Sequence, residues 1–134
     1  MNRINGKIVA VESSENISIV HVDVSGDVFS SIVLEGSKTP LKYKTGDLVT
    51  LLFKETEVGI AKNLTGSISL RNRFRSAIRN IERGPILTKV TMEYKNVAID
   101  SVITTQSAGE LNIQDNDQVE WLVKANEVTL MKDR

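Results

Sequence analysis

The sequence predicts an all-β protein made of two tandem five-stranded barrels, each with one short helical turn. Two observations lead to this prediction. Apolar and polar residues alternate with a period of two in short segments separated by turn residues, which is typical of half-buried strands. The sequence also aligns with itself without a gap at an offset of 70 residues, so one structural unit occurs twice.

The repeat is clearest in the second half of each copy. The best-matching segments are residues 45–49 with 115–119 and residues 52–58 with 122–128. We therefore expect a first domain over residues 1–64 and a second over residues 65–134, joined by a short turn-rich stretch. A unit of about 65 residues is only marginally stable alone, so the two copies are expected to pack on each other or on other chains.

The predicted elements of the first copy follow one another closely. Strands are predicted around residues 8–10, 17–24, 28–33, 48–53 and 57–61, with a helical turn over residues 39–43. Clusters of Ser, Gly, Asp and Asn between these segments predict turns. The second copy repeats the order from Phe74 to Met131. Five short strands with one helical turn are typical of an OB-like barrel.

Composition excludes several classes of function. The 17 basic and 17 acidic residues balance, so no global field favours nucleic acid or an anionic membrane. The absence of cysteine removes disulfides and thiolate chemistry, and the absence of a long apolar run predicts a soluble, cytoplasmic protein. His21 is the only histidine and is interpreted as an ordinary strand residue. Because no phosphate-binding loop, metal-ligand set or catalytic constellation is visible, an enzyme is not expected.

Hydroxyl side chains follow a predicted strand of the second copy. Thr104 or Thr105 is placed to cap a helical turn, and Ser107 lies within that turn. Free backbone N–H groups at a helix start favour an anion, and the hydroxyls add donors. The simpler interpretation is that these residues only cap the turn.

Five of the seven arginines, Arg71, Arg73, Arg75, Arg79 and Arg83, occur within 13 residues. Alternation places them mostly on one face of a strand. They are interpreted as a solvated face that protects a sheet edge, or alternatively as a nucleic-acid patch. Single-strand binders also need exposed aromatic rings, and the chain has only six aromatic residues. Lys54 and Lys124 occupy the same place in the two copies, each at the end of the fourth predicted strand.

The second copy contains three motifs: Ser69-Leu70-Arg71-Asn72 followed by Phe74, Ile103-Thr104-Thr105-Gln106-Ser107 followed by Leu111, and Lys124-Ala125 followed by Val128. In this order and spacing they resemble the molbindin family of molybdate-binding proteins, whose unit is the Mop or TOBE domain. The resemblance implies five-stranded barrels in tandem and a homotrimer that binds molybdate or tungstate between subunits. It implies that the Ser-x-Arg segment comes from one domain and the Thr, Ser and Lys from a neighbouring one.

The residues that the resemblance assigns to the oxyanion are Ser69, Leu70 through its N–H, Arg71, Thr104, Ser107, Lys124 and Ala125 as a backbone contact. No bare metal cation is implied. The first copy departs from the pattern, since Met1 stands where Arg71 is expected and Leu34 stands where Thr104 does. Ser37 and Lys54 are its remaining, weaker candidates.

The function expected from these residues is storage or homeostasis of molybdate or tungstate without chemical transformation. Two alternatives remain open: an oxyanion-sensing subunit of a molybdate transporter or repressor, and an OB-type nucleic-acid-binding module. The sequence does not choose between molybdate and tungstate, and it does not give the number of anions per assembly.

Overall fold

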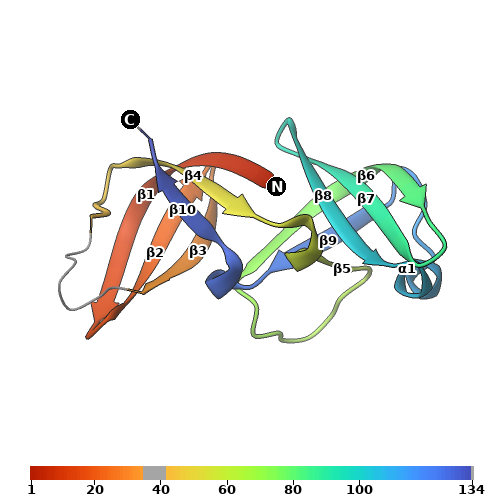
Figure 1. Cartoon of the computed structure of the whole chain (residues 1–134), viewed down its shortest axis with the longest axis horizontal. Helices are drawn as coiled ribbons and strands as arrows, with labels where there is room; N and C mark the ends of the chain where they lie inside the picture. Colours follow the sequence, from red (N-terminus) through yellow and green to blue (C-terminus); the bar gives the residue numbers. More distant parts are fainter. Residues whose placement is uncertain (35–41, 134) are drawn as a thin grey trace.

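The computed structural model describes residues 1–34 and 42–133 and contains two curled, five-stranded antiparallel sheets that lie side by side (Figure 1). The first copy contributes β1 (Asn2–Ser14), β2 (Ile17–Val24), β3 (Asp27–Leu34), β4 (Leu48–Phe53), the 3-10 turn η1 (Glu55–Glu57) and β5 (Gly59–Ala61). The second copy contributes β6 (Asn72–Arg83), β7 (Leu87–Tyr94), β8 (Val97–Thr104), α1 (Thr105–Leu111), β9 (Gln118–Val123), η2 (Ala125–Glu127) and β10 (Thr129–Lys132). The all-β prediction is confirmed for both copies, and the short helix predicted in each copy is confirmed in the second. The helical turn predicted over residues 39–43 of the first copy falls mostly outside the described residues.

The strands form where apolar residues alternate with polar ones. In β6 the side chains of Phe74, Ser76 and Ile78 are buried while the residues between them face outward. The β7–β8 hairpin closes through Lys95 and Asn96, which both have positive φ (47° and 67°). Two consecutive residues with positive φ are the signature of a two-residue hairpin turn whose twist matches that of the strands. The turn chemistry of the sequence therefore sets the strand register directly.

Both copies bend their long first strand at the same place. The register between β1 and β2 shifts between Ile8 and Ala10, and the register between β6 and β7 shifts between Ile78 and Asn80. An extra residue in one strand of an antiparallel pair increases its local bend and twist. The repeated irregularity explains why each sheet curls toward a barrel.

The two sheets exchange their fifth strands. Sheet order is β10-β4-β1-β2-β3 in the first sheet and β5-β9-β6-β7-β8 in the second, so β10 closes the first sheet and β5 the second (Figure 1). Equivalent serines hold the crossing segments, since Ser31 Oγ donates to Val128 O and Ser101 Oγ donates to Val58 O, both at 2.6 Å. Each sheet thus takes four strands from one copy and one from the other, a feature that the repeat itself does not contain.

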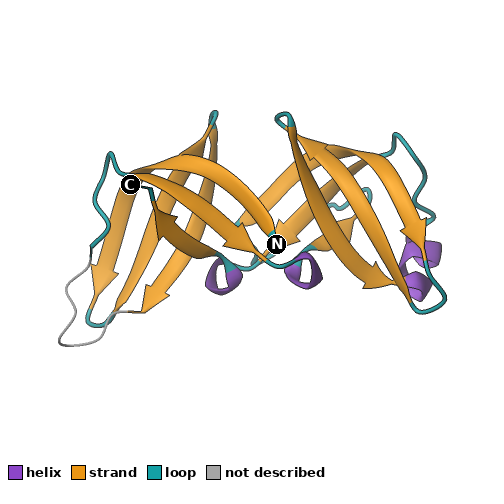
Figure 2. Ribbon diagram, turned by 45° about the horizontal axis from the view of Figure 1, so that its top comes forward, coloured by secondary structure: helices purple, strands orange, loops and turns teal. Residues whose placement is uncertain are grey.

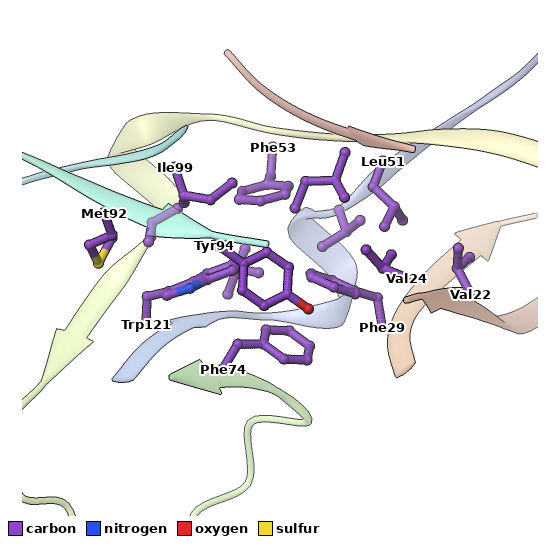
Figure 3. Packing of buried hydrophobic residues seen from close by; sticks show 14 of the residues in the cluster. Val22, Val24, Phe29, Leu51, Phe53, Phe74, Met92, Tyr94, Ile99 and Trp121 are labelled. Carbon is purple, nitrogen blue, oxygen red and sulfur yellow. The ribbon is translucent and has the colours of Figure 1, made fainter. Parts of the chain in front are cut away.

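An aromatic cluster makes the two hydrophobic cores continuous (Figure 3). Phe29 of the first sheet stacks on Phe74 of the second with ring centroids 4.0 Å apart. Phe53 of the first sheet stacks on Trp121 of the second at 5.7 Å, and Tyr94 meets Trp121 edge-on at 5.3 Å. Offset and edge-to-face contacts at these distances add to the hydrophobic contribution of burial. The two sheets therefore share one core.

Two buried asparagines connect each sheet to the edge strand of the other. Asn72 accepts a hydrogen bond from Ser30 N (2.7 Å) and donates one to Ser30 O (2.8 Å). Asn2, its equivalent in the first copy, accepts from Asp100 N and donates to Asp100 O, both at 2.9 Å. Because β3 and β8 are edge strands, these amides satisfy backbone groups that no further strand pairs.

The interpretation of the arginine run as edge protection is wrong, because β6 is the central strand of its sheet. Among the described residues, no helix is long and apolar enough to cross a membrane. Within the same residues, no group of three or more His, Cys, Asp or Glu side chains is placed to hold a metal ion.

Candidate oxyanion-binding site

The first group of predicted site residues gathers where β6 begins and β9 ends. Asn72 pairs with Val123 at the end of the β6–β9 ladder. Arg71, which precedes Asn72, and Lys124, which follows Val123, therefore lie opposite each other just beyond the last pair. Ser69, Arg71 and Lys124 are all exposed. A guanidinium, an ammonium and a hydroxyl are therefore exposed near this end of the β6–β9 ladder, in the same segments as Leu70 and Ala125.

Arg71 differs from most of the other arginines in having no partner within the described part of the chain. Arg73 forms an ion pair with Glu120, and Arg79 Nε donates to Glu93 Oε2 at 2.6 Å. Arg83 Nη2 donates to the carbonyl of Ile113 at 3.0 Å. Arg71 is thus a cation available to a ligand, while three members of the run stabilise their own sheet.

The second group lies where β8 passes into α1. Thr104 is the N-cap of α1, and its hydroxyl oxygen accepts from Ser107 N at 3.1 Å and donates to Ser107 Oγ at 2.8 Å. Thr105 turns inward instead, where its hydroxyl meets Thr88 and the carbonyl of Gly84. The structure therefore leaves Thr104 and Ser107 exposed as a hydroxyl pair at the helix start.

The two groups lie at opposite ends of the second sheet. Thr104 pairs with Leu87, which follows the turn at the far end of β6, whereas Arg71 precedes the first residue of β6. The 12 residues of β6 span on the order of 40 Å along the strand at about 3.3 Å per residue. Figure 2 shows α1 at the outer end of the molecule and the two 3-10 turns near its centre. One chain therefore does not bring all the predicted residues together.

Within one chain, Lys124 lies beside Arg71 at the central end of the second sheet, and Thr104 and Ser107 lie at the other end. The reason is the antiparallel β6–β9 pairing, which brings the end of β9 to the start of β6. Arg71 and Lys124 consequently lie at the same end of the same sheet.

The first copy presents a weaker set of donors. Lys54 is exposed after β4, but the neighbouring amino group of Met1 forms an ion pair with Glu55. Leu34, at the position equivalent to Thr104, is 76% exposed and offers no hydroxyl. Ser37 lies outside the described residues. The described part of the first copy therefore retains one of the expected cations and lacks the arginine.

An acidic pair lies next to Lys124. Burial and the nearby Glu57 carboxylate, which hydrogen-bonds with Glu127, raise the pKa of Glu127, while Lys124 partly offsets this effect. Glu57 and Glu127 belong to η1 and η2, the two 3-10 turns that lead into the exchanged strands. Two like charges are thus held close together at the crossing of the two copies.

Glu127→Gln is expected to raise the melting temperature at neutral pH by on the order of 1–3 °C. The folded chain has the higher pKa, so folded-state stability increases as pH falls through that pKa and the charged form is destabilising above it. The gain should vanish below the ordinary glutamate pKa of 4.5. Melting curves from pH 4 to 8 measure this, with the exposed Glu82→Gln as the control. A pH-independent gain would contradict the pairing.

The sequence motif contained one residue whose role only the structure reveals. Asn72 is 0% exposed and joins the start of β6 to Ser30 of the other sheet. The signal in the sequence was its recurrence as Asn2 at the same repeat position. Neither asparagine was among the predicted site residues.

The TOBE domain family model matches residues 1–60 and 68–130, which together make up most of the chain. The chain belongs to the TOBE domain family. Its two matched segments correspond to the two repeat copies. No curated protein sequence matches this TOBE chain significantly.

A solved structure shares the fold of this TOBE chain almost throughout. It is the cytoplasmic molybdate-binding protein ModG, in a form grown from PEG with molybdate bound. The TM-score is 0.89 at 23% sequence identity, and the match covers 96% of this chain and 94% of the ModG chain. At this identity the likeness establishes the fold alone.

Proposed function

We propose that this protein binds molybdate or tungstate for storage or homeostasis, without transforming the anion chemically. The observation that supports this most strongly is that Arg71, which has no partner among residues 1–34 and 42–133, lies beside Lys124 at the end of the β6–β9 ladder. Membership of the TOBE family and the likeness to ModG, which was solved with molybdate bound, support the same proposal. ModG is described as cytoplasmic, and the proposed role assigns this chain to the same compartment.

The chemistry of the residues fits a tetrahedral oxyanion. Molybdate and tungstate are dianions whose four oxygens only accept hydrogen bonds, so their binding shell must consist of donors. Arg71 and Lys124 supply charged donors, Ser69 adds a hydroxyl, and the N–H groups of Leu70 and Ala125 lie in the same stretch. Hydrogen bonds to charged groups contribute about 1.5–3 kcal/mol each, so a few of them offset the entropy of association.

Completing the shell requires more than one chain. Thr104 and Ser107 lie at the opposite end of the sheet from Arg71, so the hydroxyl pair of one chain would meet the cations of another chain. We propose a homotrimer with the anion between subunits, as the family resemblance implies. Because the first copy lacks the arginine and the threonine, the second copy supplies the principal sites.

The alternative of an OB-type nucleic-acid module is disfavoured by the placement of the aromatic residues. All six are buried: Phe29, Tyr43, Phe53, Phe74, Tyr94 and Trp121. Binding of single strands relies on exposed rings on which bases stack. An oxyanion-sensing subunit of a transporter or repressor uses the same site and differs only in its partner, so copurification with an ATPase or with DNA would identify it.

Thermal melting with added oxyanions tests the proposed function. Molybdate or tungstate at about 100 times its dissociation constant should stabilise the folded chain by roughly 2.7 kcal/mol, which corresponds to a shift of several degrees. Sulfate and phosphate at the same millimolar concentration should give little or no shift. No shift with any of the four anions would overturn the proposal.

A further inference from the structure

The residue that follows Arg71 is anchored more firmly than any of the proposed anion contacts. Asn72 is the first residue of β6 and is 0% exposed. Its side-chain oxygen accepts from Ser30 N at 2.7 Å, and its side-chain nitrogen donates to Ser30 O at 2.8 Å. Both polar groups of the amide are therefore used on one residue of β3, the edge strand of the other sheet.

The chain segment before Asn72 has few other attachments. Within the described part of the chain, no loop or turn backbone hydrogen bond holds residues 63–71. Asn72 is thus the point at which the chain becomes fixed after the stretch between the two copies. Arg71 lies one residue before this point, about 3.8 Å away along the backbone. Val123, the ladder partner of Asn72, is in turn followed directly by Lys124.

We infer that Asn72 is a positioning residue for the proposed oxyanion site, holding Arg71 and Lys124 in the arrangement that binds the anion. This inference rests on the proposed function. The amide hydrogen-bonds the start of β6 to β3, next to the end of β9. It thereby fixes the backbone direction at Arg71 and Lys124, the residues that adjoin this end of the ladder. A site held in its binding arrangement beforehand binds more tightly, because less ordering accompanies association. Asn72 itself is completely buried, so it acts through its neighbours and not by contacting the ligand.

The repeat provides a matched control within the same molecule. Asn2 is the first residue of β1, is 3% exposed and makes the same two hydrogen bonds to Asp100 of β8. No arginine precedes Asn2, so the equivalent place in the first copy lacks the guanidinium. Removing either amide breaks an equivalent link between the sheets, but only Asn72 lies next to the proposed principal contacts, Arg71 and Lys124.

The experiment compares Asn72→Ala with Asn2→Ala in the full chain. Calorimetric titration with sodium molybdate gives the affinity, and melting followed by circular dichroism gives the stability. Titrations are run well below both melting temperatures so that unfolding does not contribute. We expect similar falls in melting temperature for the two variants, a loss of affinity of tenfold or more for Asn72→Ala, and a change within about twofold for Asn2→Ala. A purely structural role for Asn72 would not produce this difference.

Other results of this comparison would contradict the inference or the proposed function. Equal changes of affinity in the two variants, or none in either, would overturn the inference while leaving the proposed function intact. Absence of molybdate binding by the unaltered chain would overturn the proposed function and the inference with it. If an alanine variant does not fold, Asn72→Ser and Asn2→Ser make a milder version of the same pair, and the same difference in affinity is expected between them.

Discussion

Arg71→Ala is expected to weaken molybdate binding by roughly 10- to 100-fold, which corresponds to the loss of one charge-assisted interaction of about 1.5–3 kcal/mol. Arg71 is exposed and has no partner within the described part of the chain, so its guanidinium is free to meet the anion. The folded chain should lose little stability, because the substitution breaks no hydrogen bond or ion pair within the residues that the structure describes. Calorimetric titration and a melting curve measure the two effects separately.

Arg75→Ala is the matched control for this prediction. Arg75 lies on the same exposed face of β6, but it is paired in the ladder with Glu120 and lies inside the sheet, away from its open end. Its removal takes away the same formal charge and should change the affinity far less. Unchanged affinity in Arg71→Ala would show that Arg71 takes no part in binding the anion. Equal losses of affinity in both variants would show that only the overall charge of this face matters.

Phe29→Ala is expected to lower the free energy of unfolding by about 3–5 kcal/mol, the range measured when a buried aromatic residue is cut to alanine. Phe29 is 0% exposed, stacks on Phe74 at 4.0 Å and lies 5.9 Å from the ring of Trp121. It belongs to the first sheet, whereas both of these neighbours belong to the second. The loss should therefore destabilise both sheets together.

Urea unfolding followed by two probes measures this effect. Trp121 is the only tryptophan, so its fluorescence reports on the second sheet, while far-ultraviolet circular dichroism reports on both. The two transitions should coincide in the unaltered chain and in the variant, because the core is shared and the fifth strands are exchanged. Phe29→Leu, which keeps much of the apolar volume, should lose less. A fluorescence transition that is unaffected by Phe29→Ala would mean that the sheets unfold independently.

Local chemistry explains why most of the elements were predictable. The segments predicted as strands at residues 17–24 and 48–53 are β2 and β4, because alternation and flanking turn residues act within a few positions of the chain. The cap at Thr104 was also predictable, since a threonine before a helical turn satisfies a backbone N–H locally. The edge-protection interpretation of the arginines failed because strand order is not a local property.

The sequence names candidate site residues but not their arrangement. The resemblance of the three motifs to the molbindin family proposes Ser69, Arg71, Thr104, Ser107 and Lys124 as oxyanion contacts. Their placement on two ends of one sheet depends on the pairing of β6 with β9 and of β7 with β8. Motif spacing along the chain does not encode which ends meet, so the sequence could not place Lys124 beside Arg71.

The strands and turns could be predicted from the amino-acid sequence, because each depends on residues near one another in the chain, and the repeat could be found by aligning the sequence with itself. The tertiary structure decided which strand completes which sheet. Strand β10 pairs with β4 and β5 pairs with β9, and these pairings between the two copies are not encoded in the strand pattern of either copy. It also decided the role of Asn72, because its partner Ser30 is 42 residues away and is brought to it only when the two sheets pack around their common core.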